Sequence, residues 1–109
     1  MSTYAFDLDG TLCSQGGNYQ NAQPYEKRIN FVNELYNQGH TIKIFTARGM
    51  NSMNGDIQQC YEKYFTLTSK QLKNWNVKYH ELILGKPSYD LIIDDKAINS
   101  ETYFEVIDI

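Results

Sequence analysis

Four short, mostly apolar runs, each with a polar or charged residue at its end or within two residues beyond it, constrain this chain more than any other feature. The runs cover residues 3–8, 41–45, 82–84 and 91–93. Between the first two runs, apolar residues recur at helical spacing over about 25–38, and Gly39 supplies a stop. Helices are also predicted over about 56–65 and, from a capping box at 68–71, to about 75. Strands that alternate with helices predict an α/β fold with a mostly parallel sheet and helices on both faces.

The remaining segments are predicted to form loops and short C-terminal elements. Segment 13–23 is polar and rich in turn formers, and segment 48–56 contains glycines and asparagines. Ser100 is a candidate cap for a final helix, and 106–107 is a candidate last strand. A length of 109 residues, with no internal repeat or linker, fits a single domain that spans 1–109.

Composition argues against several classes of partner. The net charge is −3 and no cluster of Lys and Arg stands out, which makes nucleic acid an unlikely main partner. No apolar run approaches about 18 residues, and the N-terminus lacks the basic and apolar regions of a signal peptide. No membrane association and a cytoplasmic location are therefore expected. Cys13 and Cys60 are far apart in the sequence and are expected to be free thiols.

The polar residues that follow the apolar runs predict a binding site. In chain order they are Asp7 and Asp9, Thr46, Lys86, and Asp94 and Asp95. Ligands of open parallel sheets bind beyond the carboxyl ends of the strands, where these side chains should meet. Two like charges about 4 Å apart repel by about 4 kcal/mol at an effective dielectric constant of about 20. Lys86 alone cannot balance four carboxylates, so a divalent cation is expected, and hard oxygen ligands suit Mg²⁺.

The same residues fall in four motifs that resemble those of the haloacid dehalogenase (HAD) superfamily. Phe6-Asp7-Leu8-Asp9-Gly10-Thr11-Leu12 resembles the first motif, D-x-D-G-T. The other three are Thr46 in Ile44-Phe45-Thr46-Ala47-Arg48, Lys86 in Gly85-Lys86-Pro87, and the pair in Ile92-Ile93-Asp94-Asp95-Lys96. The order of the motifs is that of the family and spans nearly the whole chain. The resemblance implies a Rossmann-like three-layer fold and a magnesium-dependent phosphatase.

The resemblance also implies a role for each site residue. Asp7 would attack phosphorus to form an aspartyl-phosphate, and Asp9 would protonate the leaving alcohol and then activate water. Thr46 and Lys86 would bind and neutralise the transferring phosphoryl group. The substrate-binding residues implied are Gly10, Thr11, Ala47 and Arg48, and the implied metal ligands are Asp7, Asp9, Asp94 and Asp95. For Arg48, a solvated loop position is an equally good interpretation.

Members of the family differ at the position of Asp9, and these differences narrow the range of reactions expected for this chain. The dehalogenases lack the second carboxylate, and the ion-pumping ATPases carry threonine there, so Asp9 favours hydrolysis of a phosphate ester. The segments between the motifs are too short to house a cap domain. Among capless members, the chain resembles small phosphatases encoded with bacterial capsule and surface-polysaccharide genes. A small phosphorylated sugar is therefore the expected substrate.

Three other functions stay open on the sequence alone. A polynucleotide 3′-phosphatase is compatible with a capless site, and a non-catalytic domain of the same fold would bind phosphate without turnover. A receiver domain has similar groups, but its phosphorylated aspartate lies on a later strand. An uncovered site would be open to water, so either the loop 13–23 or a neighbouring subunit of a homo-oligomer is expected to cover it.

Overall fold

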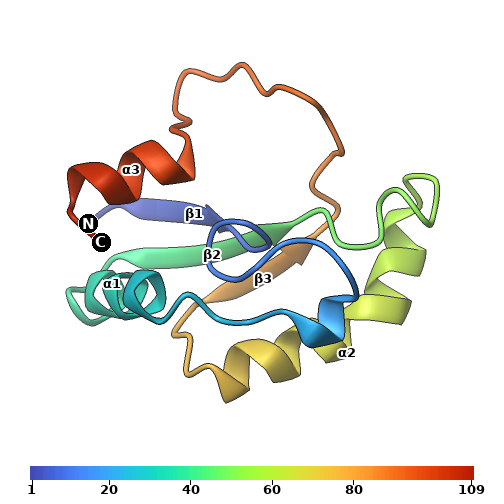
Figure 1. The fold of residues 1–109 in the computed structure, drawn as a ribbon, viewed down its shortest axis with the longest axis horizontal. Helices are drawn as coiled ribbons and strands as arrows, with labels where there is room; N and C mark the ends of the chain where they lie inside the picture. Colours follow the sequence, from blue (N-terminus) through green and yellow to red (C-terminus); the bar gives the residue numbers. More distant parts are fainter.

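The computed structural model describes residues 1–109 as three strands, three α-helices and one 3₁₀ helix (Figure 1). In chain order they are β1 (Thr3–Asp7), η1 (Tyr19–Asn21), α1 (Glu26–Asn37), β2 (Thr41–Thr46), α2 (Ile57–Asn74), β3 (Glu81–Leu84) and α3 (Ser100–Val106). Strands and helices alternate up to β3, as predicted, and no separate cap domain interrupts them.

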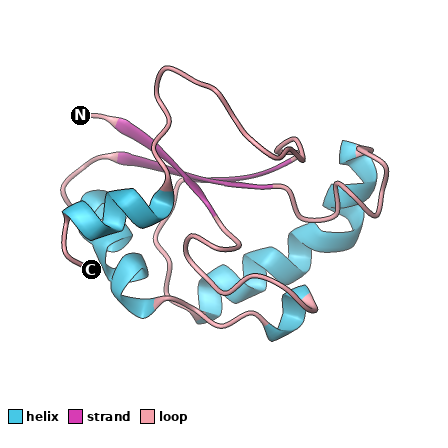
Figure 2. Ribbon diagram, turned by 45° about the horizontal axis from the view of Figure 1, so that its top comes forward, coloured by secondary structure: helices cyan, strands magenta, loops and turns pink.

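The three strands, magenta in Figure 2, form one parallel sheet. Strand β2 lies between β1 and β3. Asp7 pairs in register with Phe45, and Thr46 pairs with Leu84, so the strands end together at one edge. The predicted α/β class and parallel order are confirmed. This edge is where the sequence predicts the site.

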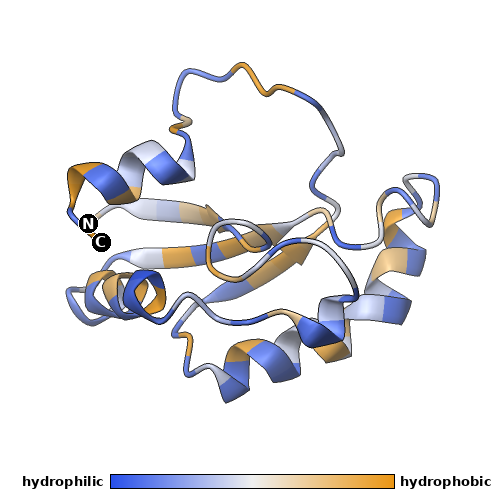
Figure 3. Cartoon of the chain, viewed as in Figure 1, coloured by the Kyte–Doolittle hydropathy of each residue, from blue (hydrophilic) through white to orange (hydrophobic).

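The core lies between the helices and one face of the sheet. Along β2, Ile42, Ile44 and Thr46 are buried, whereas the residues between them are half-buried. From α3, the ring of Phe104 stacks on that of Phe6 in β1, with centroids 6.5 Å apart. Figure 3 shows hydrophobic residues concentrated along the central strands. The alternation of side chains along a strand thus directs one set of residues into the core.

Helix α2 is one helix where the sequence predicts two. Asp56 caps its N-terminus, since the side chain accepts a hydrogen bond from the backbone N–H of Gln59. The predicted capping box at 68–71 lies inside the helix, where Thr68 and Gln71 are both buried. Their side chains bind another side chain of the core and not the backbone N–H groups of a helix start.

The fourth apolar run does not form the predicted strand. Residues 85–99 arc away from the sheet as an irregular segment, and the outer edge of β1 has no partner (Figure 1). Leu91 is 76% exposed and Ile93 is 91% exposed. The Asp94 side chain accepts a hydrogen bond from the backbone N–H of Lys96, which stabilises a local turn in place of an extended strand.

The C-terminal elements also differ in detail from the prediction. Helix α3 is capped by Asn99, whose side chain accepts hydrogen bonds from the backbone N–H groups of Glu101 and Thr102, and Ser100 is its first residue. Residues 106–107 end this helix and form no strand. Among the helices, none combines the length and apolar character needed to cross a bilayer.

Candidate active site

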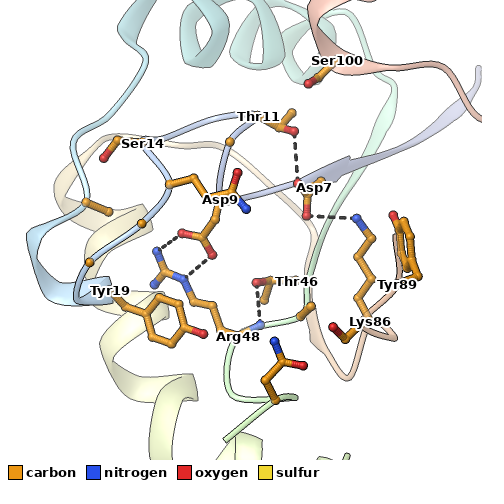
Figure 4. Close-up of a pocket in the computed structure, with 18 of the residues that line it drawn as sticks. Asp7, Asp9, Thr11, Ser14, Tyr19, Thr46, Arg48, Lys86, Tyr89 and Ser100 are labelled. Atoms are coloured by element: carbon orange, nitrogen blue, oxygen red, sulfur yellow. Dashed lines mark hydrogen bonds and ion pairs between the residues drawn. The ribbon is translucent and has the colours of Figure 1, made fainter. Parts of the chain in front are cut away.

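A polar cavity of about 550 Å³ opens where the three strands end (Figure 4). Only four of its twenty lining residues are hydrophobic, which favours a charged or strongly polar ligand. One wall comes from the loop 13–23, which contributes residues from Ser14 to Tyr19. Of the predicted site residues, the cavity is lined by Asp7, Asp9, Gly10, Thr11, Thr46, Ala47, Arg48 and Lys86.

Asp7, the last residue of β1, is held from both sides. Its Oδ1 lies 3.1 Å from Lys86 Nζ, and its Oδ2 accepts a hydrogen bond of 3.1 Å from Thr11 Oγ1. The Asp7 side chain is 33% exposed, so the carboxylate remains open to the cavity. An oriented and accessible carboxylate next to a cation is the arrangement that nucleophilic attack on a phosphate requires.

A tight turn follows β1 and fixes Asp9 and Thr11. Gly10 has a φ of 82°, a conformation that side chains disfavour, and a Cβ there would lie 2.8 Å from Gln15 Oε1. The backbone N–H groups of Gly10 and Thr11 donate within the turn, to the carbonyls of Cys13 and Leu8. These two N–H groups are therefore engaged by the turn, and the role of Gly10 shown here is to shape it.

Thr46 and Lys86 come from the ends of the neighbouring strands. Thr46 is buried, and its Oγ1 accepts a hydrogen bond from the backbone N–H of Arg48, which leaves the hydroxyl proton to donate. Lys86 follows β3, and its backbone N–H donates to the carbonyl of Thr46. Partial burial lowers the pKa of Lys86, but the hydrogen bond to Tyr89 and the charge of Asp7 outweigh it and hold the pKa above its ordinary value.

Arg48 is neither a solvated loop residue nor positioned to bind substrate. It is 1% exposed, and its Nε and Nη2 each donate to Asp9 at 2.9 Å. Its Nη1 donates to Thr68 Oγ1 at 3.1 Å and to Gln71 Oε1 at 2.6 Å. The second Nη2 proton points toward Cys13 Sγ at 3.9 Å. All five N–H donors thus have protein partners, which leaves none for a substrate phosphate.

Asp94 and Asp95 do not join the other predicted site residues. Both are exposed on segment 85–99 and do not line the cavity. No group of three or more His, Cys, Asp or Glu side chains lies close enough to hold a metal ion. The predicted excess of negative charge is therefore not present, because Lys86 pairs with Asp7 and Arg48 pairs with Asp9. Of the four predicted metal ligands, only Asp7 and Asp9 line the cavity.

Comparison with known proteins shows the family. A family model described as haloacid dehalogenase-like hydrolase matches residues 4–70. The chain belongs to this family. The match covers the D-x-D-G-T turn and Thr46 but ends before Lys86. The crystal structure of an MCSG target from Vibrio cholerae is also similar to this HAD-like hydrolase, with a TM-score of 0.86 and 30% identity over 94% of this chain and 87% of the other. No match was found among curated protein sequences.

Cys13 lies beneath Asp9 as a protonated thiol. The side chain is fully buried, and its Sγ donates to Asp9 Oδ1 at 3.5 Å. Burial, and then the negative charge of Asp9, raise the pKa of the Cys13 thiol from 9.0 to about 12. Since the thiolate is the reactive form of cysteine, Cys13 is not suited to act as a nucleophile at neutral pH.

This raised pKa predicts a loss of stability in alkali. Between about pH 9 and about pH 12 the unfolded chain releases the Cys13 proton before the folded protein does, so the free energy of unfolding should fall as pH rises. Below pH 9 the folded and the unfolded chain both keep the proton, so Cys13 no longer makes the free energy of unfolding depend on pH. Urea unfolding should show a steeper alkaline decline for the wild type than for Cys13→Ala. Equal slopes for the two proteins would contradict the buried thiol.

Proposed function

We propose that this HAD-like hydrolase is a phosphomonoesterase in which Asp7 is the nucleophile and Asp9 is the general acid and base. The observation that best supports this proposal is the set of contacts made by the Asp7 carboxylate. Its carboxylate is fixed between Lys86 Nζ and Thr11 Oγ1, each at 3.1 Å, and opens into a polar cavity. A metaphosphate-like group approaching that carboxylate would meet Lys86 and the Thr46 hydroxyl on the way.

Phosphate binding is assigned to the side chains that keep free donors. Lys86 has three ammonium protons, and its Nζ lies 3.1 Å from Asp7 and 5.3 Å from the centroid of the Tyr89 ring, which leaves a proton for a phosphoryl oxygen. The Thr46 hydroxyl accepts from a backbone N–H and keeps its own proton for a phosphoryl oxygen. These donors offset the charge that spreads over the phosphoryl oxygens in the transition state.

The reaction then takes two displacements at phosphorus. A carboxylate oxygen of Asp7 forms a bond to phosphorus as the bond to the leaving oxygen breaks, and Asp9 transfers its proton to that oxygen. In the second step a water molecule attacks the aspartyl-phosphate, and the Asp9 carboxylate accepts a proton from this water. The products are the alcohol and inorganic phosphate, and both aspartates return to their initial states.

Magnesium is part of the proposal because HAD-like hydrolases generally use it. When bound, it would neutralise charge between the nucleophile and the phosphate. The proposed ligands are Asp7, Asp9 through its carbonyl oxygen, Asp94 and Asp95. The last two lie on the exposed segment 85–99, so the arrangement described above supplies only part of this ligand set.

Removal of metal should therefore stop phosphate release. Activity should disappear with excess EDTA and return with excess Mg²⁺. The double variant Asp94→Asn/Asp95→Asn should need at least about tenfold more Mg²⁺ for half-maximal activity, because its charged ligands are lost. Asp90→Asn is the matched control, since Asp90 is exposed on the same segment. Full turnover in rigorously metal-free protein would refute the metal requirement.

The proposed substrate is a small phosphorylated sugar or a related metabolite of bacterial surface polysaccharide synthesis. A polar cavity of about 550 Å³ supports a small and hydrophilic substrate. The deciding experiment is a phosphate-release screen of the purified protein with Mg²⁺ against sugar phosphates, nucleotides and phosphorylated polynucleotide ends. Preference for a 3′-phosphorylated polynucleotide would replace the sugar proposal, and no release from any substrate would overturn the phosphatase assignment.

A further inference from the structure

The two side chains of the ion pair between Arg48 and Asp9 differ in their exposure to the cavity. The Arg48 side chain is fully buried, whereas the Asp9 side chain is 19% exposed. Two parallel N–H···O contacts of 2.9 Å join them, a geometry that fixes the plane of the carboxylate. Figure 4 shows the Asp9 carboxylate directed toward Arg48 and the Asp7 carboxylate directed toward Lys86. Each aspartate of the first motif thus has its own cation.

The guanidinium of Arg48 is also bound by protein groups other than Asp9. Its Nη1 is bound by Thr68 and Gln71, which are buried one helical turn apart on α2. The ring of Tyr19 lies 4.9 Å from the guanidinium carbon, and the Tyr19 carbonyl accepts a hydrogen bond from the Gln71 side chain. The guanidinium is therefore fixed in position and orientation by a helix and by the wall loop of the cavity.

We propose that Arg48 is the positioning residue of Asp9. It fixes where the two carboxylate oxygens lie, through a bidentate contact made by a fully buried guanidinium. The contacts with Arg48 use one lone pair of each oxygen, so Oδ2 keeps a second lone pair for the proton that moves. This inference rests on the proposed phosphatase function, because it assigns a partner to the acid and base of that reaction.

A test must separate this role from ordinary support of the fold. With nitrophenyl phosphate the leaving group needs little protonation, so the formation of aspartyl-phosphate depends weakly on Asp9. Decay of this intermediate requires Asp9 to activate water. A residue that acts through Asp9 should therefore affect decay and spare formation, whereas general damage to the fold should slow both.

Arg48→Lys keeps the charge but loses the bidentate contact. In single-turnover experiments with nitrophenyl phosphate, the burst of nitrophenolate should stay within about twofold of the wild-type rate, and decay of the adduct should slow about 10- to 100-fold. In an Asp9→Asn background the same substitution should change the decay rate by less than about twofold, because the two residues act as a unit. Equal slowing of burst and decay, or an equal effect of Arg48→Lys in both backgrounds, would overturn the proposal.

A second pair of variants covers the case in which Arg48→Lys does not fold. Thr68→Val keeps Arg48 and its contact with Asp9 but removes one acceptor of Nη1. Decay of the adduct should slow several-fold with an unchanged burst. Thr66→Val is the matched control, since Thr66 is exposed on the same helix. Identical decay in the two variants would refute the positioning role. Absence of any adduct in both the wild type and Asp9→Asn would instead refute the proposed function itself, and the assignment of Arg48 with it.

Discussion

Asp7→Asn should abolish turnover completely, whereas Asp9→Asn should stop the reaction after its first step, with phosphate still bound to Asp7. The amide that replaces the Asp7 carboxylate cannot attack phosphorus, so no covalent intermediate can form. Asp9→Asn keeps the nucleophile with its contacts to Lys86 and Thr11. It loses the acid and base and, with it, the negative charge that pairs with Arg48. This loss should cost about 10²- to 10⁴-fold in rate on an alkyl phosphate.

The two variants differ most clearly with a good leaving group. With nitrophenyl phosphate, Asp9→Asn should accumulate a phosphorylated protein, since the first step proceeds and water is not activated for the second. Intact-protein mass spectrometry after an acid quench should detect this adduct, and peptide mapping should place it on Asp7. Asp7→Asn should never show it. An adduct on Asp94 or Asp95 would show that the nucleophile has been assigned wrongly and would favour a receiver-like reaction.

Lys86→Met should reduce turnover by about 10²- to 10³-fold, the loss typical of one preorganised charge that faces the reacting group. Methionine keeps much of the length and volume of the side chain but removes the ammonium that lies 3.1 Å from Asp7. The wild-type lysine should remain charged up to and beyond its ordinary pKa, because that pKa is raised. No loss of activity due to Lys86 is therefore expected between about pH 5 and about pH 9.

Lys70→Met is the matched control for this prediction. Lys70 is exposed on α2 and does not line the cavity, so its removal takes away one positive charge outside the site. Steady-state rates with a sugar phosphate should separate the two variants by at least about 50-fold. Similar rates for both would mean that Lys86 contributes only to the overall charge of the protein, and its assigned role would then be abandoned.

The strands were predicted correctly where an apolar run lies next to another strand with which it can pair. The runs at 82–84 and 91–93 look alike in sequence, yet only the first forms a strand. Leu82 and Leu84 are buried beside β2, whereas Ile93 is 91% exposed. A strand depends on hydrogen bonds to a neighbouring strand, and an apolar run does not reveal whether the chain reaches one. The same limit explains why Asp94 and Asp95 were expected at the edge of the sheet.

The candidate site was predictable for residues at the end of a strand or within two residues beyond it. Asp7, Thr46 and Lys86 meet because parallel strands end at one edge. The partner of Asp9 was missed because Arg48 contacts residues on a helix about 20 positions later. One signal was present in the sequence. Thr68 and Gln71 lie on the buried face of α2, and buried polar side chains need partners.

The irregular segment after β3 has a consequence for how freely one wall of the cavity can change. Beyond Lys86, no backbone N–H of residues 87–98 donates to a backbone carbonyl, yet Pro87, Ser88 and Tyr89 form part of the cavity wall. Doubling the length of such a loop costs only about 0.6 kcal/mol in closure entropy. Mutation and insertion at 87–90 can therefore reshape this wall of the cavity, while Asp7 and Thr46 stay fixed at the ends of the strands. Under the proposed function, such changes would alter which substrates enter and leave the nucleophile in place.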